Sequence, residues 1–160
     1  MTPQATDASV RKSVTVDASQ ERAFTVFTDG MSAWWPLESH HTGAQDATGV
    51  VIEPRAGGRW YERGADGGEC DWGRVLAWEP PGRVLLAWYL DPDFAFDADS
   101  AHATEVEVRF VAEEPGRTRV ELEHRGFERH GDRAGETRAA VGGAGGWSSL
   151  LEAFAGAAAA

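Results

Sequence analysis

Apolar and polar residues alternate most regularly in the second half of the chain. Between residues 104 and 110 apolar side chains alternate with charged ones, and the pattern returns over 118–125 after the turn at Pro115-Gly116. This period of two predicts an antiparallel strand pair with one apolar face and one charged face, whose opposite charges pair across the strands. By parity, His124 lies on the apolar face.

Five further segments carry strand-like patterns bounded by turn residues. They cover residues 10–17, 50–53, 59–63, 70–78 and 83–89. The sequence Asp66-Gly67-Gly68 predicts a hairpin between the third and fourth of them. Residues 91–103 form a polar, acidic excursion before the regular pair begins.

Two short helices are predicted after the first strand. Ser19 is placed to cap a helix whose apolar stripe includes Phe24 and Phe27, and Asp29-Gly30 ends it. A second helix covers Met31 to Trp35 and stops at Pro36.

A long C-terminal helix is predicted over roughly Asp132 to Ala157. Trp147, Leu150, Leu151 and Phe154 recur at i, i+3, i+4 and i+7, which places them on one core-facing stripe. Four glycines between residues 142 and 146 interrupt this pattern, so either other contacts hold the stretch or the helix kinks there.

Together these elements predict an α+β fold of the helix-grip type. One curved antiparallel sheet of about seven strands wraps around the C-terminal helix, with the short helices after the first strand. The 160 residues suit a single domain, with its core over about 10–156. A sheet curved around one amphipathic helix leaves a cavity between the two.

Charge and cysteine content narrow the function. There are 15 basic and 26 acidic residues, and the net charge of −11 disfavours nucleic acid or an anionic membrane as partner. Cys70 is the only cysteine, which rules out an internal disulfide and a cysteine-rich zinc site. No signal peptide or spanning apolar run is visible, so we expect a cytoplasmic protein.

Several segments jointly resemble a known family, the START-like or SRPBCC superfamily, in its branch named after the activator of the heat-shock protein 90 ATPase. The resemblance covers about Val10 to Phe154. The segments are Val14–Phe27, Trp34-Trp35-Pro36, Gly57–Glu62, Trp72–Val75, Trp78–Pro81, Thr118–Phe127 and Gly146–Leu151.

This resemblance implies a deep, mostly apolar pocket between the sheet and the C-terminal helix. Relatives include lipid and polyketide binders, aromatase/cyclases and a co-chaperone domain. The branch has no shared catalytic residues that transfer to this chain, so the fold does not decide the function.

The candidate ligand-binding residues follow from strand parity and aromatic content. Trp60 and Glu62 share one strand face, and Trp72, Arg74, Leu76 and Trp78 share a face of the next strand. A three-residue loop at Asp66–Gly68 puts both sets on the same side, whereas a two-residue loop puts them on opposite sides. The predicted site comprises Trp35, Trp60, Glu62, Trp72, Arg74, Trp88, His124 and Trp147.

Other reactive groups offer little. His40-His41 and Glu38 lack a second cluster of metal-ligand spacing, so we expect no metal and no cofactor. Cys70 lies between Glu69 and Asp71, whose charge disfavours its thiolate.

Three functions remain open, and the sequence does not indicate an oligomeric state. The first is a carrier or sensor of a small hydrophobic or aromatic molecule. The second is a cyclase-like or hydrolytic enzyme in which His124, Glu62 or Arg74 assists. The third is a co-chaperone-like module that binds a protein partner and keeps its interior filled.

Overall fold

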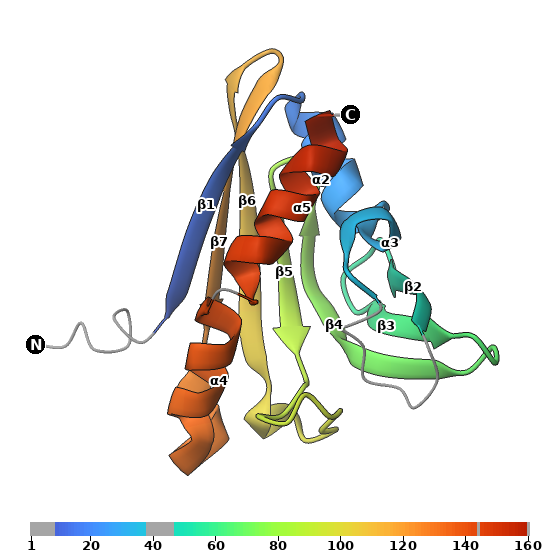
Figure 1. Cartoon of the computed structure of the whole chain (residues 1–160), viewed down its shortest axis with the longest axis vertical. Coiled ribbons are helices and arrows are strands. Elements are labelled where there is room, and N and C mark those ends of the chain that lie inside the picture. Colours follow the sequence, from blue (N-terminus) through green and yellow to red (C-terminus); the bar gives the residue numbers. More distant parts are fainter. Residues whose placement is uncertain (1–8, 38–46, 144, 160) are drawn as a thin grey trace, which may run out of the picture.

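The computed structural model describes residues 9–37, 47–143 and 145–159 (Figure 1). Seven strands, four α-helices and two 3₁₀ segments follow one another within these ranges. The order is β1 (Val10–Val16), α2 (Gln20–Thr28), α3 (Met31–Trp34), β2 (Ala47–Ile52), β3 (Arg59–Gly64), β4 (Glu69–Glu79), β5 (Arg83–Trp88), η1 (Ser100–His102), β6 (Thr104–Glu114), β7 (Arg117–Arg125), η2 (Phe127–Arg133), α4 (Ala134–Gly142) and α5 (Trp147–Ala159).

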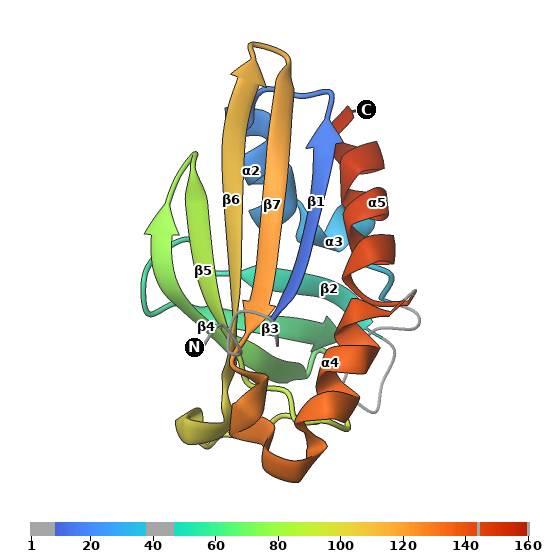
Figure 2. The ribbon, with the colours of Figure 1, turned by 90° about the vertical axis from the view of Figure 1, so that its left-hand side faces the viewer.

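The strands form one antiparallel sheet in the order β1-β7-β6-β5-β4-β3-β2. The sheet curls, and α5 lies along its concave side beside β1, with α2 and α3 completing the inner layer (Figures 1 and 2). This arrangement confirms the predicted α+β helix-grip fold. None of the helices in the described ranges has the length and apolarity to span a membrane.

The hairpin between β3 and β4 settles the register that the sequence left open. Glu62 pairs with Cys70, which places Glu62 and Trp72 on the same inner face of the sheet. Gly64 and Gly68 close the loop through a backbone hydrogen bond of 2.8 Å. The register then shifts between Trp60 and Tyr61, because β4 carries Trp72 as an extra residue there.

Two irregularities in β4 overturn one prediction. Because the first bulge lies at Trp72 and a second lies between Val75 and Ala77, the strand does not alternate regularly. The prediction that Trp72, Arg74, Leu76 and Trp78 share a face is therefore wrong. Trp72 is 1% exposed and Leu76 is 45% exposed, whereas Trp78 packs against Phe24 on the inner side.

Gly73 explains why the first bulge fits here. A Cβ atom on this residue would lie 1.8 Å from the backbone oxygen of Ala87 on β5. Only glycine allows this close approach of β4 to β5, so the bulge depends on that residue.

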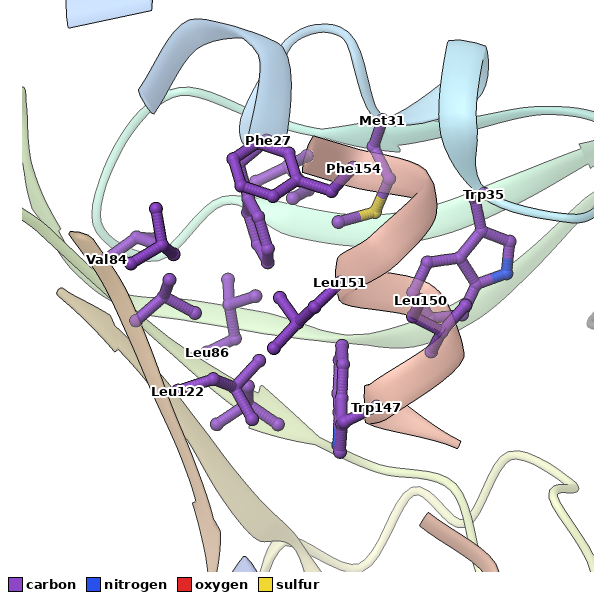
Figure 3. Packing of buried hydrophobic residues seen from close by; sticks show 14 of the residues in the cluster. Phe27, Met31, Trp35, Val84, Leu86, Leu122, Trp147, Leu150, Leu151 and Phe154 are labelled. Carbon is purple, nitrogen blue, oxygen red and sulfur yellow. The ribbon is translucent and has the colours of Figure 1, made fainter. Parts of the chain in front are cut away.

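The apolar stripe of α5 is buried as predicted. In Figure 3, Leu151 points toward Leu86 of the sheet, Phe154 lies beside Phe27 of α2, and Leu150 lies beside Trp35. Arg22 of α2 donates to the backbone oxygens of Ala157 and Ala158, which satisfies carbonyl groups at the end of α5.

The predicted C-terminal helix is divided into η2, α4 and α5. The break falls in the glycine-rich stretch between Gly142 and Trp147. A Cβ on Gly146 would lie 2.1 Å from the backbone oxygen of Val141, so the connection from α4 to α5 requires glycine at that position. The glycines thus interrupt the helix and let α5 turn onto the sheet.

Candidate functional site

Six ring side chains from different elements meet beneath the N-terminal end of α5. We call them the inner aromatic cluster: Trp35, Trp60, Trp72, Trp88, His124 and Trp147. Neighbouring ring centroids in the cluster lie 4.9 to 6.1 Å apart. Each of these residues is at most 6% exposed. Trp35 follows α3 and Trp147 begins α5 (both labelled in Figure 3), and the other four rings come from the sheet, so the helical layer and the sheet meet in this cluster.

Seven of the eight predicted site residues are therefore together on the inner face. Glu62 joins the cluster because its side chain accepts a hydrogen bond of 2.7 Å from the indole nitrogen of Trp72. Arg74 does not join it, because the bulge turns its side chain outward. Its side chain is 40% exposed, and its guanidinium lies 4.0 Å from Asp71.

Two indole N–H groups in the cluster have no hydrogen-bond acceptor within the described residues. They belong to Trp60 and Trp88, which are 0% and 4% exposed. Each such buried donor costs the folded state about 1–3 kcal/mol when it stays unpaired. The ring centroids of Trp60 and Trp88 lie 5.8 Å apart, so both donors belong to one small region of the interior.

The hydrogen bonds of His124 fix its protonation. Trp147 donates its indole N–H to Nδ1 of His124 at 3.0 Å, and Nε2 lies 2.8 Å from the hydroxyl oxygen of Thr104. Because an indole nitrogen only donates, Nδ1 must be the unprotonated nitrogen and Nε2 must carry the proton. Burial, reinforced by the charge of His130, lowers the pKa of His124 to about 3.

These contacts remove His124 as a general base at neutral pH. Its one lone pair on nitrogen already accepts from Trp147, and its Nε2 proton is directed at Thr104. Glu62 remains as a candidate base, because it is buried on the inner face and its carboxylate contacts the cluster through Trp72.

Thr104 is the functional candidate that the sequence reasoning missed. It is fully buried on β6 and stands opposite Trp88 of β5. The signal was available: a hydroxyl occupies an inner-face position in a strand that otherwise presents Val106, Val108 and Phe110. Phe127 was also missed, and its ring packs 4.7 Å from that of His124.

The described ranges contain no group of three or more potential metal-binding side chains. His40, His41 and Glu38 lie outside the described residues. Cys70 is a free, half-buried thiol. A groove of about 340 Å³ runs over the opposite, outer face of the sheet, and its lining is mostly charged, from Arg11, Lys12, Ser13, Glu107, Arg109, Glu121, Leu122 and Glu123.

Comparisons with known proteins agree with this geometry. An anthrahydroquino-γ-pyrone synthase, solved as a complex, is 43% identical, with 92% of this chain and 95% of that chain covered and a TM-score of 0.65. The self-sacrificing resistance protein CalC from Micromonospora echinospora is 31% identical, with 94% and 93% covered and a TM-score of 0.64.

A more distant likeness shows the fold alone. The Aha1 dimer from Colwellia psychrerythraea is 17% identical, with 94% and 96% covered and a TM-score of 0.62. No curated protein matches this chain at a significant level. The family model described as Activator of Hsp90 ATPase homolog 1-like protein matches residues 17–159, and the chain belongs to that family.

Proposed function

We propose that this protein binds an oxygenated, polycyclic aromatic molecule in the inner aromatic cluster and promotes closure of a pyrone ring on it. The observation that carries the proposal is the pair of buried indole donors, Trp60 and Trp88, which lack acceptors among the described residues. A quinone or phenol oxygen supplies such an acceptor, and flat rings match the tryptophan faces.

The cluster also sets the conditions of binding. Its rings contact one another in this structure, so a ligand enters by replacing ring–ring contacts with ring–ligand contacts. A ligand oxygen that pairs with Trp60 or Trp88 removes the penalty of an unpaired buried donor. An aromatic hydrocarbon without oxygen gains only the stacking.

The 43% identical relative supports ring closure as the reaction, because it is an anthrahydroquino-γ-pyrone synthase. Closure of a γ-pyrone from a phenol and a neighbouring 1,3-diketone forms one C–O bond and releases water. A base that takes the phenol proton accelerates the step. We assign that role to Glu62, because both nitrogens of His124 are engaged.

The binding test uses 1,8-dihydroxyanthraquinone and fluorescence quenching of the tryptophans. We expect Trp60→Phe and Trp88→Phe each to raise the dissociation constant about tenfold, since one hydrogen bond is worth about 1.4 kcal/mol. Trp34→Phe is the matched control: its indole N–H already donates to the backbone oxygen of Val26, and its affinity should not change.

The turnover test uses a 1-hydroxyanthraquinone with a 1,3-diketone side chain on the adjacent carbon, followed by absorbance. Wild type should accelerate closure, and Glu62→Gln should lose at least a hundredfold in rate while it still binds the dihydroxyanthraquinone. Binding without turnover would leave a carrier or sensor. Failure to bind any oxygenated aromatic would reject the proposal and favour a protein partner.

A further inference from the structure

Thr104 carries a hydroxyl proton that has no acceptor in the part of the chain that the structure describes. Within the described residues, its one side-chain hydrogen bond joins its oxygen to Nε2 of His124 at 2.8 Å. Since Trp147 donates to Nδ1, Nε2 must be the donor in this bond, and the oxygen of Thr104 is the acceptor. The Thr104 proton therefore points elsewhere within a fully buried site.

We call the chain of hydrogen bonds through Trp147, His124 and Thr104 the relay, and its donors all point in one direction. The Trp147 indole donates to His124, His124 donates to Thr104, and the Thr104 hydroxyl is left to donate onward. A hydroxyl that accepts from a charged or polarised donor is itself a stronger donor, because hydrogen bonds in a chain polarise one another. Thr104 stands opposite Trp88 on the neighbouring strand, so its proton joins the indole donors of Trp60 and Trp88 on one face.

We infer that Thr104 is a third ligand-binding donor, oriented by the Trp147–His124 relay, and that the three donors form a site for a carbonyl or phenolate oxygen of the ligand. This inference rests on the proposed function, since it names the ligand group that the inner aromatic cluster recognises. His124 and Trp147 act here as positioning residues. They set the direction of the Thr104 hydroxyl and do not exchange protons with the ligand.

The relay is tested first without any ligand. In protein labelled with ¹⁵N-histidine, two-dimensional ¹H–¹⁵N spectra should show His124 as the Nε2–H tautomer alone at pH 7. Trp147→Phe removes the donor to Nδ1 and should introduce a population of the Nδ1–H tautomer. A wild-type His124 that carries its proton on Nδ1 would overturn the relay, whatever the protein binds.

The donor role of Thr104 is tested with 1,8-dihydroxyanthraquinone. Thr104→Val keeps the shape of the side chain and removes the hydroxyl, and we expect a dissociation constant about tenfold higher. Thr104→Ser keeps the hydroxyl and should stay within about twofold of wild type. Equal affinities of the valine and serine variants would overturn the inference while leaving the proposed function intact.

Two substitutions at His124 separate orientation from packing. The amide of glutamine offers an oxygen acceptor and a nitrogen donor at nearly the spacing of the two imidazole nitrogens, so His124→Gln should retain affinity. His124→Leu breaks the relay and should weaken binding about tenfold, with little further loss when Thr104→Val is added. Additive losses would contradict the relay, and a wild type that does not bind the probe would reject the proposed function itself.

Discussion

The two faces of the curved sheet differ in whether their buried polar groups have hydrogen-bond partners. On the outer face, Glu107 is only 4% exposed and still lies within 2.6 to 2.9 Å of three guanidinium groups, those of Arg83, Arg109 and Arg125. On the inner face, the indole N–H groups of Trp60 and Trp88 are equally buried and have no acceptor among the described residues.

Under the proposed function, this difference separates a face whose buried polar groups pair with each other from one whose donors would pair with a ligand. Buried polar groups in native proteins are nearly always paired, so several unpaired donors in one place call for an explanation. On the outer face the charges satisfy each other, and that face needs nothing more than solvent. The ligand oxygen that we propose would supply the acceptor that the inner donors lack.

The largest expected effect compares two tryptophans of the inner aromatic cluster. Trp72→Phe removes the donor that holds the buried carboxylate of Glu62, whereas Trp60→Phe removes a donor without an acceptor. Both changes delete the same ring atoms. We expect Trp72→Phe to lower the free energy of unfolding by about 2 kcal/mol more than Trp60→Phe, because hydrogen bonds to charged groups are the stronger ones.

Urea-induced unfolding of both variants measures the difference. We expect the loss for Trp147→Phe to lie between those of the other two variants. It removes a hydrogen bond, but the acceptor left unpaired is one nitrogen of neutral His124. If Trp60→Phe proved as destabilising as Trp72→Phe, the Trp60 donor would have a partner in solution, and the contrast between the faces would weaken.

The strand pattern was readable from the sequence because parity is strict wherever one face is buried. His124 was placed correctly on the inner face by counting along β7, and the stripe of α5 was placed by its helical spacing. Both predictions rest on local periodicity, and β7 contains no bulge near His124.

Arg74 was misplaced for a physical reason that periodicity does not carry. A bulge adds one residue to β4 at Trp72 and turns Arg74 to the outer side, and it forms because Gly73 lets the backbone approach Ala87. The second bulge restores the alternation, so Trp78 faces inward again. The glycine was visible in the sequence, but its partner across the sheet was not. Thr104 was overlooked because its role depends on the hydrogen bonds of His124, a residue of another strand.

The pH dependence of stability gives a second, smaller effect on the inner face. Burial lowers the pKa of His124 to about 3, whereas the unfolded chain has the ordinary value of 6.5. Between these values the unfolded state binds a proton that the folded state does not, so stability falls as pH falls. From pH 6.5 to 5 this contributes a loss of about 1.5 kcal/mol in the free energy of unfolding.

His124→Gln keeps the hydrogen bonds and cannot titrate, so its stability should vary less over this range. Urea unfolding at several pH values compares the two proteins, and the other four histidines of the chain are present in both. The difference between wild type and variant should shrink by about 1.5 kcal/mol as the pH drops from 6.5 to 5. Parallel curves would show that His124 charges freely and is not held neutral.

The smallest expected effect lies on the outer face, at Glu107. Burial raises the pKa of this carboxyl, but the hydrogen bonds from Arg83 and Arg125 and the charge of Arg109 outweigh it and hold the pKa below 4.5. Glu107→Gln leaves these guanidinium groups, which are 28 to 55% exposed, without their shared anion. Because solvent screens them, we expect a loss of only about 1 kcal/mol at pH 7.

A matched control separates the Glu107 cluster from ordinary surface pairs. Glu121→Gln removes a carboxylate whose side chain is 42% exposed and pairs with Arg119, and no measurable change in unfolding free energy is expected. A lowered carboxyl pKa stabilises only above the ordinary value, so wild type and Glu107→Gln should converge as pH falls below 4.5. If Glu107→Gln lowers the free energy of unfolding at pH 7 no more than Glu121→Gln does, the pairing of three arginines with one carboxylate adds nothing to stability. The two faces would then differ only in the unpaired inner donors, which the proposed ligand would pair.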